Sequence, residues 1–329
     1  MEKSIKILKS LQHDNGLFKA ASCGETGYDK CWIRDTLYAL LGLEAAKEMD
    51  SVVKGLHTLF DIFLKHEYKI DWAVKEKPQH KHQYIHARYD AKTYEEFHED
   101  WGNKQNDAIG AFLWKVGDLE RKGVKVLRGD NDSRILQKLV MYLASIEYWH
   151  DKDNGMWEND EEVHASSVGA CVAGLLRVKG IVDVPNWLVN AGKETLWMLL
   201  PAESCSKKVD LALLSLIYPY DVVDLAMKQK ILSNVEEYLV REKGLIRYSG
   251  DWYYNEEGEA EWTMGFAWLS IIYRSFGDAH KSGYYLDKVK EAAMPNGEMP
   301  ELYHAKSKMP NRNSPLAWAQ SLRIVAEAP

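Results

Sequence analysis

The sequence lacks the features that mark membrane and secreted proteins. No uninterrupted apolar run reaches the length of about eighteen residues that a membrane-spanning helix needs. The first sixteen residues also lack the long apolar core of a secretory signal. These absences predict a soluble, cytoplasmic protein that does not associate with a membrane.

Cysteine is scarce, with four residues in a chain of 329. Cys23, Cys31, Cys171 and Cys205 form no CxxC pair, and a chain of this size does not need disulfide bonds for stability. We therefore expect buried free thiols, and we expect no metal site built on sulfur.

The charge pattern and the missing motifs exclude further classes. The net charge is −7 with both signs interspersed, whereas a nucleic-acid-binding protein would present a basic face. The sequence has no GxGxxG, GxxxxGKS/T or GxSxG motif, so it lacks the signatures of dinucleotide, P-loop and nucleophile-elbow sites. His80, His82 and His86 lie close together, but no carboxylate or cysteine at a fixed spacing completes a metal site. We expect no metal, no cofactor and no nucleic-acid partner.

Aromatic residues and helical periodicity are abundant. Twelve Trp and eighteen Tyr are many for an acidic protein, and such flat rings either fill a core or stack on the apolar faces of sugars and bases. Apolar residues recur at spacings of three and four from end to end, while alternating β-branched runs are nearly absent. The pattern predicts an all-α protein with helices at 2–12, 35–48, 51–67, 105–122, 132–149, 164–178, 185–199, 209–217, 222–240, 261–276, 279–292 and 314–326.

The connections between these helices alternate in length. Because short connections make antiparallel neighbours, the alternation places every long loop at the same end of the assembly. We expect a single (α/α)6 barrel of six helical hairpins, with an irregular helical array as the alternative. No Pro-, Gly- or Ser-rich linker interrupts the series, which favours one domain over residues 1–329. The long loops are 13–34, 68–104, 150–163, 200–208, 241–260 and 293–313.

The third long loop contains a carboxylate that capping does not explain. The acids at 160–162 directly precede an apolar helix, and the exposed amides of a helix N-terminus favour acids there. Glu158 instead follows a large aromatic residue in a turn opened by an Asn-Gly pair, ahead of that region. We therefore treat Glu158 as a candidate for chemistry.

Other long loops bring polar and aromatic residues to the same end of the predicted barrel. Arg34 and Asp35 lie where the first loop meets a helix, and a helix cap with its ion-pair partner is the alternative explanation for them. Capping also accounts for Asp107, but not for the tryptophan ahead of it. Glu301 follows a proline in a segment too rich in turn residues to be helical. The rings collected at this end are Trp32, Trp101, Trp157, Trp252 and Trp262.

Aromatic walls with a few convergent carboxylates suit carbohydrate chemistry. Cleaving a glycosidic bond needs one acid that protonates the leaving oxygen and a second carboxylate on the opposite side of the sugar. When the second group acts as a base through water, the two carboxyl groups stand roughly 6.5 to 9.5 Å apart. Arginine and aspartate side chains can hold the hydroxyl groups of the terminal sugar through charged hydrogen bonds.

Seven segments, in order along nearly the whole chain, carry a resemblance to a known family. They are CWIRDTLYALLGLEAA, WGNKQNDAIGAFLW, YWHDKDNGMWE, VDLALLSLIYP, RYSGDWYY, MPELY and SPLAWAQSL. Together they resemble the glucoamylase-type glycoside hydrolases of family 15. They are also similar to the glucoamylase-like region of the phosphorylase kinase regulatory subunits.

The resemblance implies roles for individual residues. Glu158 matches the family's general acid, and Glu301 matches the general base that activates water for attack with inversion at the anomeric carbon. Burial beside Trp157 would raise the pKa of the acid, which suits proton donation near neutrality. The residues to which we assign substrate binding are Trp32, Arg34, Asp35, Trp101, Gln105, Asp107, Trp157, Arg247 and Asp251.

The sequence departs from the family's pattern on the leaving-group side. The family often has a second glutamate directly after the acid, which contacts the next sugar, whereas Asn159 stands here. The loop that often reads Gly-Arg-Pro-Gln is Gly-Asn-Lys-Gln at 102–105. We also expect neither an N-terminal β-sandwich nor a starch-binding module. These departures indicate short soluble α-glucosides as substrates, rather than granular starch.

The main hypothesis is an inverting, exo-acting glycoside hydrolase that releases glucose from short α-linked gluco-oligosaccharides without a cofactor. The alternative is a catalytically weak glucoamylase-like module that binds sugar and regulates, which Asn159 and the similarity to the kinase subunits motivate. Trehalose is a third candidate substrate, because some family members cleave it. The sequence predicts neither the linkage nor the protein partners.

Overall fold

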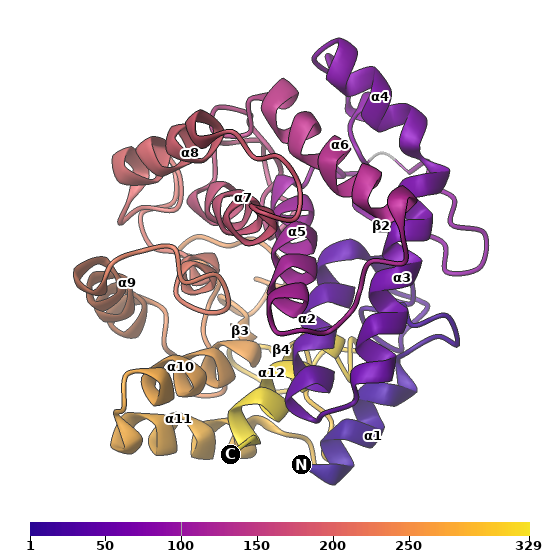
Figure 1. Ribbon diagram of the computed structural model, residues 1–329. Helices are drawn as coiled ribbons and strands as arrows, with labels where there is room; N and C mark the ends of the chain where they lie inside the picture. The colour runs from indigo at the N-terminus through magenta and orange to yellow at the C-terminus, as the bar shows by residue number, and fades with distance from the viewer. Residues whose placement is uncertain (100) are drawn as a thin grey trace.

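The computed structural model describes residues 1–99 and 101–329, and its architecture is almost entirely helical (Figure 1). The α-helices are α1 (Glu2–Ser10), α2 (Ile33–Ala45), α3 (Met49–Lys65), α4 (Glu67–Lys75), α5 (Asn106–Arg121), α6 (Asp130–Ile146), α7 (Ala165–Val178), α8 (Asn186–Leu199), α9 (Leu225–Tyr238), α10 (Met264–Ser275), α11 (Ala279–Ala292) and α12 (Ala317–Glu327). The shorter elements are the 3-10 helices η1 (Lys81–Gln83) and η2 (Leu211–Leu216) and the strands β1 (Cys31–Trp32), β2 (Arg88–Tyr89), β3 (Glu261–Trp262) and β4 (Leu302–Tyr303).

Six helical elements form a closed inner ring. The order around the ring is α2, α5, α7, η2, α10 and α12, and α12 contacts α2 again. The inner helices are buried on nearly all sides, since every residue from 106 to 119 of α5 and from 264 to 273 of α10 is buried. A helix that is apolar all round must be covered all round. The prediction of an (α/α)6 barrel is therefore confirmed.

The outer helices cover this ring from outside. In α9 and α11 only three residues each are buried, as expected for helices that present one side to the core. Helix α3 packs on α2, α8 on α7 and α11 on α10, while α1 packs on α12. The amino group of Met1 also pairs with Glu327 at 2.9 Å, so the two ends of the chain meet where the ring closes (Figure 1).

Two elements differ from the sequence prediction. Residues 68–75, predicted as part of a loop, belong to α4 (Glu67–Lys75), which packs on α6. The apolar pattern was hidden because one of its three buried residues is a lysine, Lys69. The segment predicted as a helix at 209–217 is the 3-10 helix η2, which Asp210 caps by accepting a hydrogen bond from the Ala212 amide. Pro219 follows closely and disfavours a longer helix.

The cysteine prediction is correct for two of the four residues. Cys31 and Cys171 are buried free thiols, whereas Cys23 is partly exposed and Cys205 is exposed. The two exceptions lie in long loops rather than in helices. Among residues 1–99 and 101–329, no group of His, Cys, Asp and Glu side chains is arranged to hold a metal ion. Within the same residues, no helix combines the length and apolar character needed to cross a membrane.

Two small antiparallel ladders tie together long loops that are distant in sequence. Strand β1 pairs with β2, with Trp32 opposite Arg88, and joins the first long loop to the second. Strand β3 pairs with β4, with Trp262 opposite Leu302, and joins the fifth long loop to the sixth. These ladders hold the loop end of the barrel in place.

Candidate active site

A cavity of about 340 Å³ opens where the long loops meet. Its walls come from the first, second, third, fifth and sixth long loops and from the adjoining helix ends. Of the residues predicted for the site, those that line the cavity are Trp32, Arg34, Asp35, Trp101, Trp157, Glu158, Arg247 and Glu301. The structure thus brings the two predicted catalytic carboxylates to one cavity.

Glu158 is held in the cavity wall by three donors. Its Oε1 accepts hydrogen bonds from Gln105 Nε2 at 3.3 Å and from Arg34 Nη2 at 3.4 Å, and its Oε2 accepts one from the Trp101 indole at 3.1 Å. The side chain is 24% exposed. Burial raises the pKa of Glu158 to about 7, with Asp35 acting in the same direction and the Arg34 charge opposing both. A carboxylic acid with this pKa can carry a proton near neutrality.

The backbone at Glu158 is strained in a way that aims its side chain. Its φ is +61°, a left-handed conformation that residues other than glycine seldom adopt and that clusters at functional sites. The turn is closed by the Asn159 amide, which donates to the Asn154 carbonyl at 3.0 Å. Gly155 packs against the ring of His164, and a Cβ there would come within 2.7 Å of that ring. The Asn-Gly turn is therefore required for the position of the acid.

Glu301 is the more deeply buried carboxylate, at 1% exposure. Its Oε2 accepts hydrogen bonds from the side-chain amides of Asn311 and Asn313, the latter at 2.7 Å, and a long one from the Tyr253 hydroxyl at 3.5 Å. Its Oε1 has no hydrogen-bond partner among the residues that the structure describes. Burial raises the pKa of Glu301, while the two amide hydrogen bonds lower it. Described donors thus fix one of the two oxygens.

Arg34 is buried next to Glu158, and its positive charge is paired with the carboxylate of Asp107. Its Nη1 donates to both carboxylate oxygens of Asp107 at 3.1 Å and to Gln105 Oε1 at 2.9 Å. Gln105 and Asp107 are outside the described lining of the cavity and lie beside Arg34. Asp35 does line the cavity, and burial raises its pKa to about 6. Trp32 and Gln105 occupy the N-cap positions of α2 and α5, so neither Asp35 nor Asp107 is an N-terminal cap.

Arg247, a second arginine in the cavity wall, is also paired with a buried aspartate. Its Nε and Nη2 donate to the two carboxylate oxygens of Asp251 at 2.6 and 2.7 Å. Its guanidinium carbon lies 4.7 Å from the ring centroid of Trp262 and 5.4 Å from that of Trp157, which are distances of cation–π attraction. Asp251 is absent from the described lining, so it positions Arg247 rather than contacting the cavity.

The aromatic walls are themselves hydrogen-bonded or stacked. The Trp157 indole donates to Asp210 Oδ1 at 2.7 Å, and its ring lies 6.1 Å from that of Trp318 in a stacked arrangement. Trp32 meets Trp101 edge to face at 5.8 Å. Because a buried indole that has a hydrogen-bond partner keeps one orientation, the Trp157 ring forms a wall of fixed shape.

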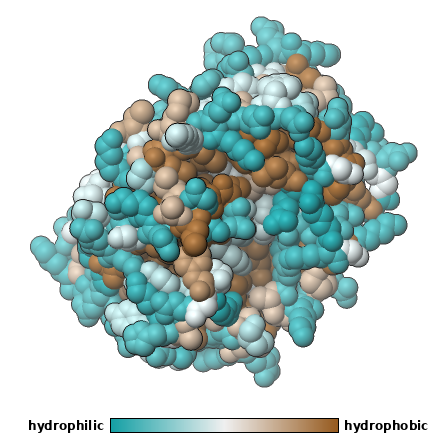
Figure 2. Space-filling view, turned by 60° about the vertical axis from the view of Figure 1, so that its left-hand side comes forward, coloured by the Kyte–Doolittle hydropathy of each residue, from teal (hydrophilic) through white to brown (hydrophobic). Residues whose placement is uncertain are grey.

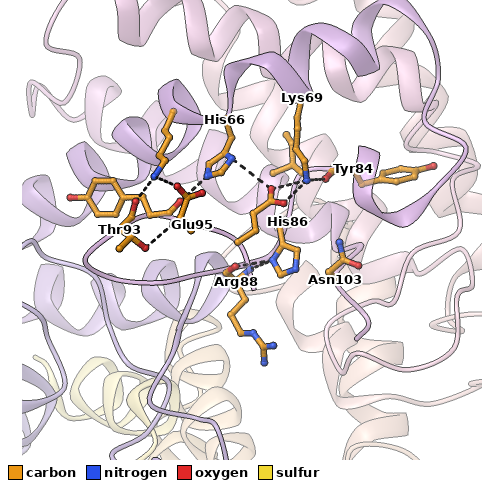
Figure 3. Close-up of polar contacts among 12 residues, drawn as sticks. His66, Lys69, Tyr84, His86, Arg88, Thr93, Glu95 and Asn103 are labelled. Atoms are coloured by element: carbon orange, nitrogen blue, oxygen red, sulfur yellow. Dashed lines mark hydrogen bonds and ion pairs between the residues drawn. The ribbon is translucent and has the colours of Figure 1, made fainter. Parts of the chain in front are cut away.

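Polar contacts fasten the second long loop to the helices behind it (Figure 3). Lys69 donates to the Tyr84 carbonyl at 3.2 Å, and His86 Nδ1 accepts a hydrogen bond from the Arg88 amide at 3.0 Å. The Arg88 guanidinium carbon lies 4.5 Å from the Trp101 ring centroid and 5.0 Å from that of Trp32. The loop held in this way places the Arg88 guanidinium and the Trp101 indole in the cavity wall.

Several residues of the site were not found from sequence. They are the lining residues Tyr28, Arg88, Tyr253 and Trp318, and the two amides Asn311 and Asn313 that bind Glu301. Trp318 lies in SPLAWAQSL, a segment that carried the family resemblance, so a signal for it existed. The asparagines resemble ordinary turn residues in sequence, because only the fold shows that their amides reach Glu301.

Known proteins of similar structure share this fold over nearly the whole chain. A solved wild-type glycosidase superposes with a TM-score of 0.84 at 19% identity, covering 99% of this chain and 94% of the other. The glucoamylase of Saccharomycopsis fibuligera gives 0.73 at 13% identity, covering 98% of this chain and 92% of the other. A bacterial glucoamylase complexed with acarbose gives 0.71 at 16% identity, covering 99% of this chain and 54% of the other.

Similar sequences include subunits of a kinase. The liver isoform of the phosphorylase b kinase regulatory subunit alpha from Mus musculus is 25% identical, over 90% of this chain and 30% of the subunit. A probable subunit of the same kind from Caenorhabditis elegans is 23% identical, over 89% of this chain and 30% of that protein. The chain therefore spans about a third of the length of these relatives. Residues 2–185 match the family described as Glycosyl hydrolases family 15, which is more than half of the chain. The protein belongs to glycosyl hydrolases family 15.

Proposed function

We propose that this protein is an inverting, exo-acting glycoside hydrolase that releases glucose from short α-linked gluco-oligosaccharides. We also propose that residues 1–329 form one catalytic domain and that it acts in the cytoplasm. The observation that carries the proposal is the pair Glu158 and Glu301 in one cavity, each held by donors on one side. Burial raises the pKa of both carboxyl groups, and the donors on each of them favour its charged form.

Glu158 is the proposed general acid. With a pKa of about 7 it can donate a proton to the glycosidic oxygen as the bond from that oxygen to the anomeric carbon breaks. The donors from Arg34, Gln105 and Trp101 then stabilise the carboxylate that remains.

Glu301 is the proposed general base. Its Oε1 accepts a proton from water while the water oxygen forms a bond to the anomeric carbon on the face opposite the leaving group. The amides of Asn311 and Asn313 support the charged form of Glu301 that this step needs. The products are glucose of inverted anomeric configuration and a saccharide shortened by one sugar, and no cofactor takes part.

The remaining walls explain the proposed exo action. Arg34, Asp35 and Arg247 present charged hydrogen-bonding groups to a terminal sugar, and the surrounding tryptophans offer flat faces to its ring. A small cavity with these walls admits the end of a chain rather than its middle.

A second candidate function is a sugar-binding regulatory module that turns over slowly or not at all. The observation that favours it is the similarity to kinase regulatory subunits, together with Asn159 beside the acid. Both functions use the same cavity, so turnover separates them.

The first test is proton NMR of maltotriose in the minutes after protein is added. Early appearance of β-glucose supports inversion, whereas early α-glucose contradicts the roles given to Glu158 and Glu301. Isomaltose and trehalose are tested next. If no glucose is released from any of the three substrates, the result favours the regulatory module.

The base is tested by the variant Glu301→Gln. We expect it to lower kcat by about a hundredfold or more while the protein stays folded. The matched control is Glu298→Gln, which changes a nearby glutamate of the same loop outside the described cavity lining. Equal activity of the two variants would contradict the proposed base.

A further inference from the structure

The fourth long loop, residues 200–208, contributes no described residue to the wall of the catalytic cavity, but it borders two hollows beside it. The nearer one, called here the outer hollow, has a volume of about 910 Å³. The farther one, called the distal hollow, has a volume of about 630 Å³. The residues shared by the catalytic cavity and the outer hollow are Trp101, Glu158, Asn159 and Trp252. The residues shared by the outer and distal hollows are Ser206, Lys207, Tyr248 and Ser249. The three spaces therefore lie next to one another in this order.

The order of the three spaces gives a longer substrate a direction. An exo-acting enzyme encloses the terminal sugar, so the rest of the substrate must leave the cavity past the group that protonates the leaving oxygen. Glu158 is that group, and it lines both the catalytic cavity and the outer hollow. The path of a longer substrate thus leads through the outer hollow toward the distal hollow at the end of α9.

The junction between the two hollows is held by fixed contacts. Lys207 Nζ donates to Asn159 Oδ1 at 2.8 Å and lies 4.2 Å from the centroid of the Tyr248 ring. Tyr248 is 9% exposed, so its ring forms a rigid floor. Asn159, the residue next to the acid, is in this way linked to the loop that borders the distal hollow.

The distal hollow has the mixed lining that a sugar chain requires. Sugars present apolar ring faces and hydroxyl edges, and such ligands need flat apolar surface with a few polar groups beside it. Tyr238, at the end of α9, is 53% exposed and offers one ring to this space. Figure 2 turns the side of the molecule with α8 and α9 forward and shows hydrophobic patches interrupted by hydrophilic side chains. The lining includes Pro201, Val209 and Leu239 as apolar residues and Asn234, Ser206 and Ser249 as polar ones.

We propose that the distal hollow is a saccharide-binding site for sugars of the substrate that lie several units from the scissile bond, with Tyr238 as a stacking platform. The inference rests on the proposed function, because Glu158 as the acid gives the chain its direction. A peptide of a protein partner is a different occupant. The position of the distal hollow, next to the outer hollow that adjoins the catalytic cavity, and the polar share of its lining favour the saccharide.

The test compares substrates of different length in the full-length protein. We expect Tyr238→Ala to lower kcat/KM for a heptasaccharide of glucose about fivefold, the loss of one aromatic contact, and to leave kcat/KM for the disaccharide unchanged. The series is measured with α-1,4 and with α-1,6 linkages. The matched control is Tyr284→Ala on α11, where the tyrosine has a similar exposure of 54% and lies outside the described lining of all three spaces.

Each other result has a defined meaning. An equal loss at both lengths, no loss at either, or the same loss in Tyr284→Ala overturns the site and leaves a protein segment as the alternative occupant. Activity on trehalose alone also overturns it, because that disaccharide has no further chain.

If the protein hydrolyses none of these sugars, the proposed function fails and binding decides the site. Calorimetry should then show tighter binding of the heptasaccharide than of the disaccharide, by a margin that Tyr238→Ala abolishes. Equal affinity for the two lengths, or no binding, overturns the distal site.

Discussion

The indole nitrogen of Trp101 donates a hydrogen bond to Oε2 of Glu158 across 3.1 Å, although the two residues come from different long loops. A donor to a carboxylate stabilises its charged form and therefore lowers its pKa. The ring that walls the cavity thus also helps to set the pH at which the acid loses its proton.

The first prediction concerns the alkaline limb of the pH profile. The proposed acid must be protonated, so activity in the wild-type protein falls as the pH rises through about 7. Trp101→Phe removes the donor, the pKa of Glu158 rises, and the alkaline limb of kcat/KM moves upward by about half a unit to one unit. Trp72→Phe, at an exposed ring on α4, is the control and should leave the limb in place. A downward shift in Trp101→Phe would contradict the assignment.

The second prediction concerns the acidic limb. Hydrogen bonds from Asn313 and Asn311 lower the pKa of Glu301. In Asn313→Ala the charged base loses one donor, its pKa rises, and the acidic limb of kcat/KM moves to higher pH by about one unit. Asn190→Ala on the exposed face of α8 is the control. An acidic limb that stays fixed while kcat falls would show that Asn313 acts on packing instead.

The third prediction concerns stability. Asp107 is 1% exposed and is the carboxylate partner of the buried Arg34. Asp107→Ala removes the nearer counter-ion of that buried cation and leaves the longer contact with Glu158 at 3.4 Å, which lowers the free energy of unfolding by about 3 kcal/mol, measured by urea denaturation. Removing a partner of the exposed pair between Lys6 and Glu2 should leave the urea midpoint unchanged. Similar effects in the two variants would argue against a buried ion pair.

The fourth prediction concerns the pH dependence of stability. Burial lowers the pKa of His164, but the hydrogen bond and charge of Glu203, at 3.3 Å, outweigh it, and the pKa rises to about 9. A raised histidine pKa adds stability that is complete below pH about 6.5 and is lost as the pH rises through about 9. We expect the wild-type protein to exceed His164→Gln by about 3 kcal/mol at pH 6 in urea unfolding, and this difference to vanish at pH 9.5. A difference that does not change with pH would contradict the charged pair.

The sequence sufficed to predict the barrel and to single out Glu158 and Glu301 as the proposed catalytic pair, because both leave local signals. The alternating loop lengths indicated the closed ring of helices. Glu158 and Glu301 lie in turns, where helix capping does not explain a glutamate. The sequence could not tell which of the two predicted aspartates, Asp35 or Asp107, faces the cavity. Asp35 lines it, whereas Asp107 turns to Arg34, since that choice depends on packing between loops some seventy residues apart. Helix α4 escaped notice because a buried lysine interrupts its apolar face.

The 3-10 helix η2 is the irregular member of the inner ring, and it begins beside the residue that holds a cavity wall in place. Asp210 Oδ1 accepts a hydrogen bond from the Ala212 amide, which caps η2, and a second one from the Trp157 indole. Replacing η2 with a regular α-helix would make the barrel more symmetrical, but it would move this shared oxygen away from the indole. The irregular helix η2 therefore constrains any redesign of the barrel. A redesign that made all six inner helices regular would change the shape of the cavity.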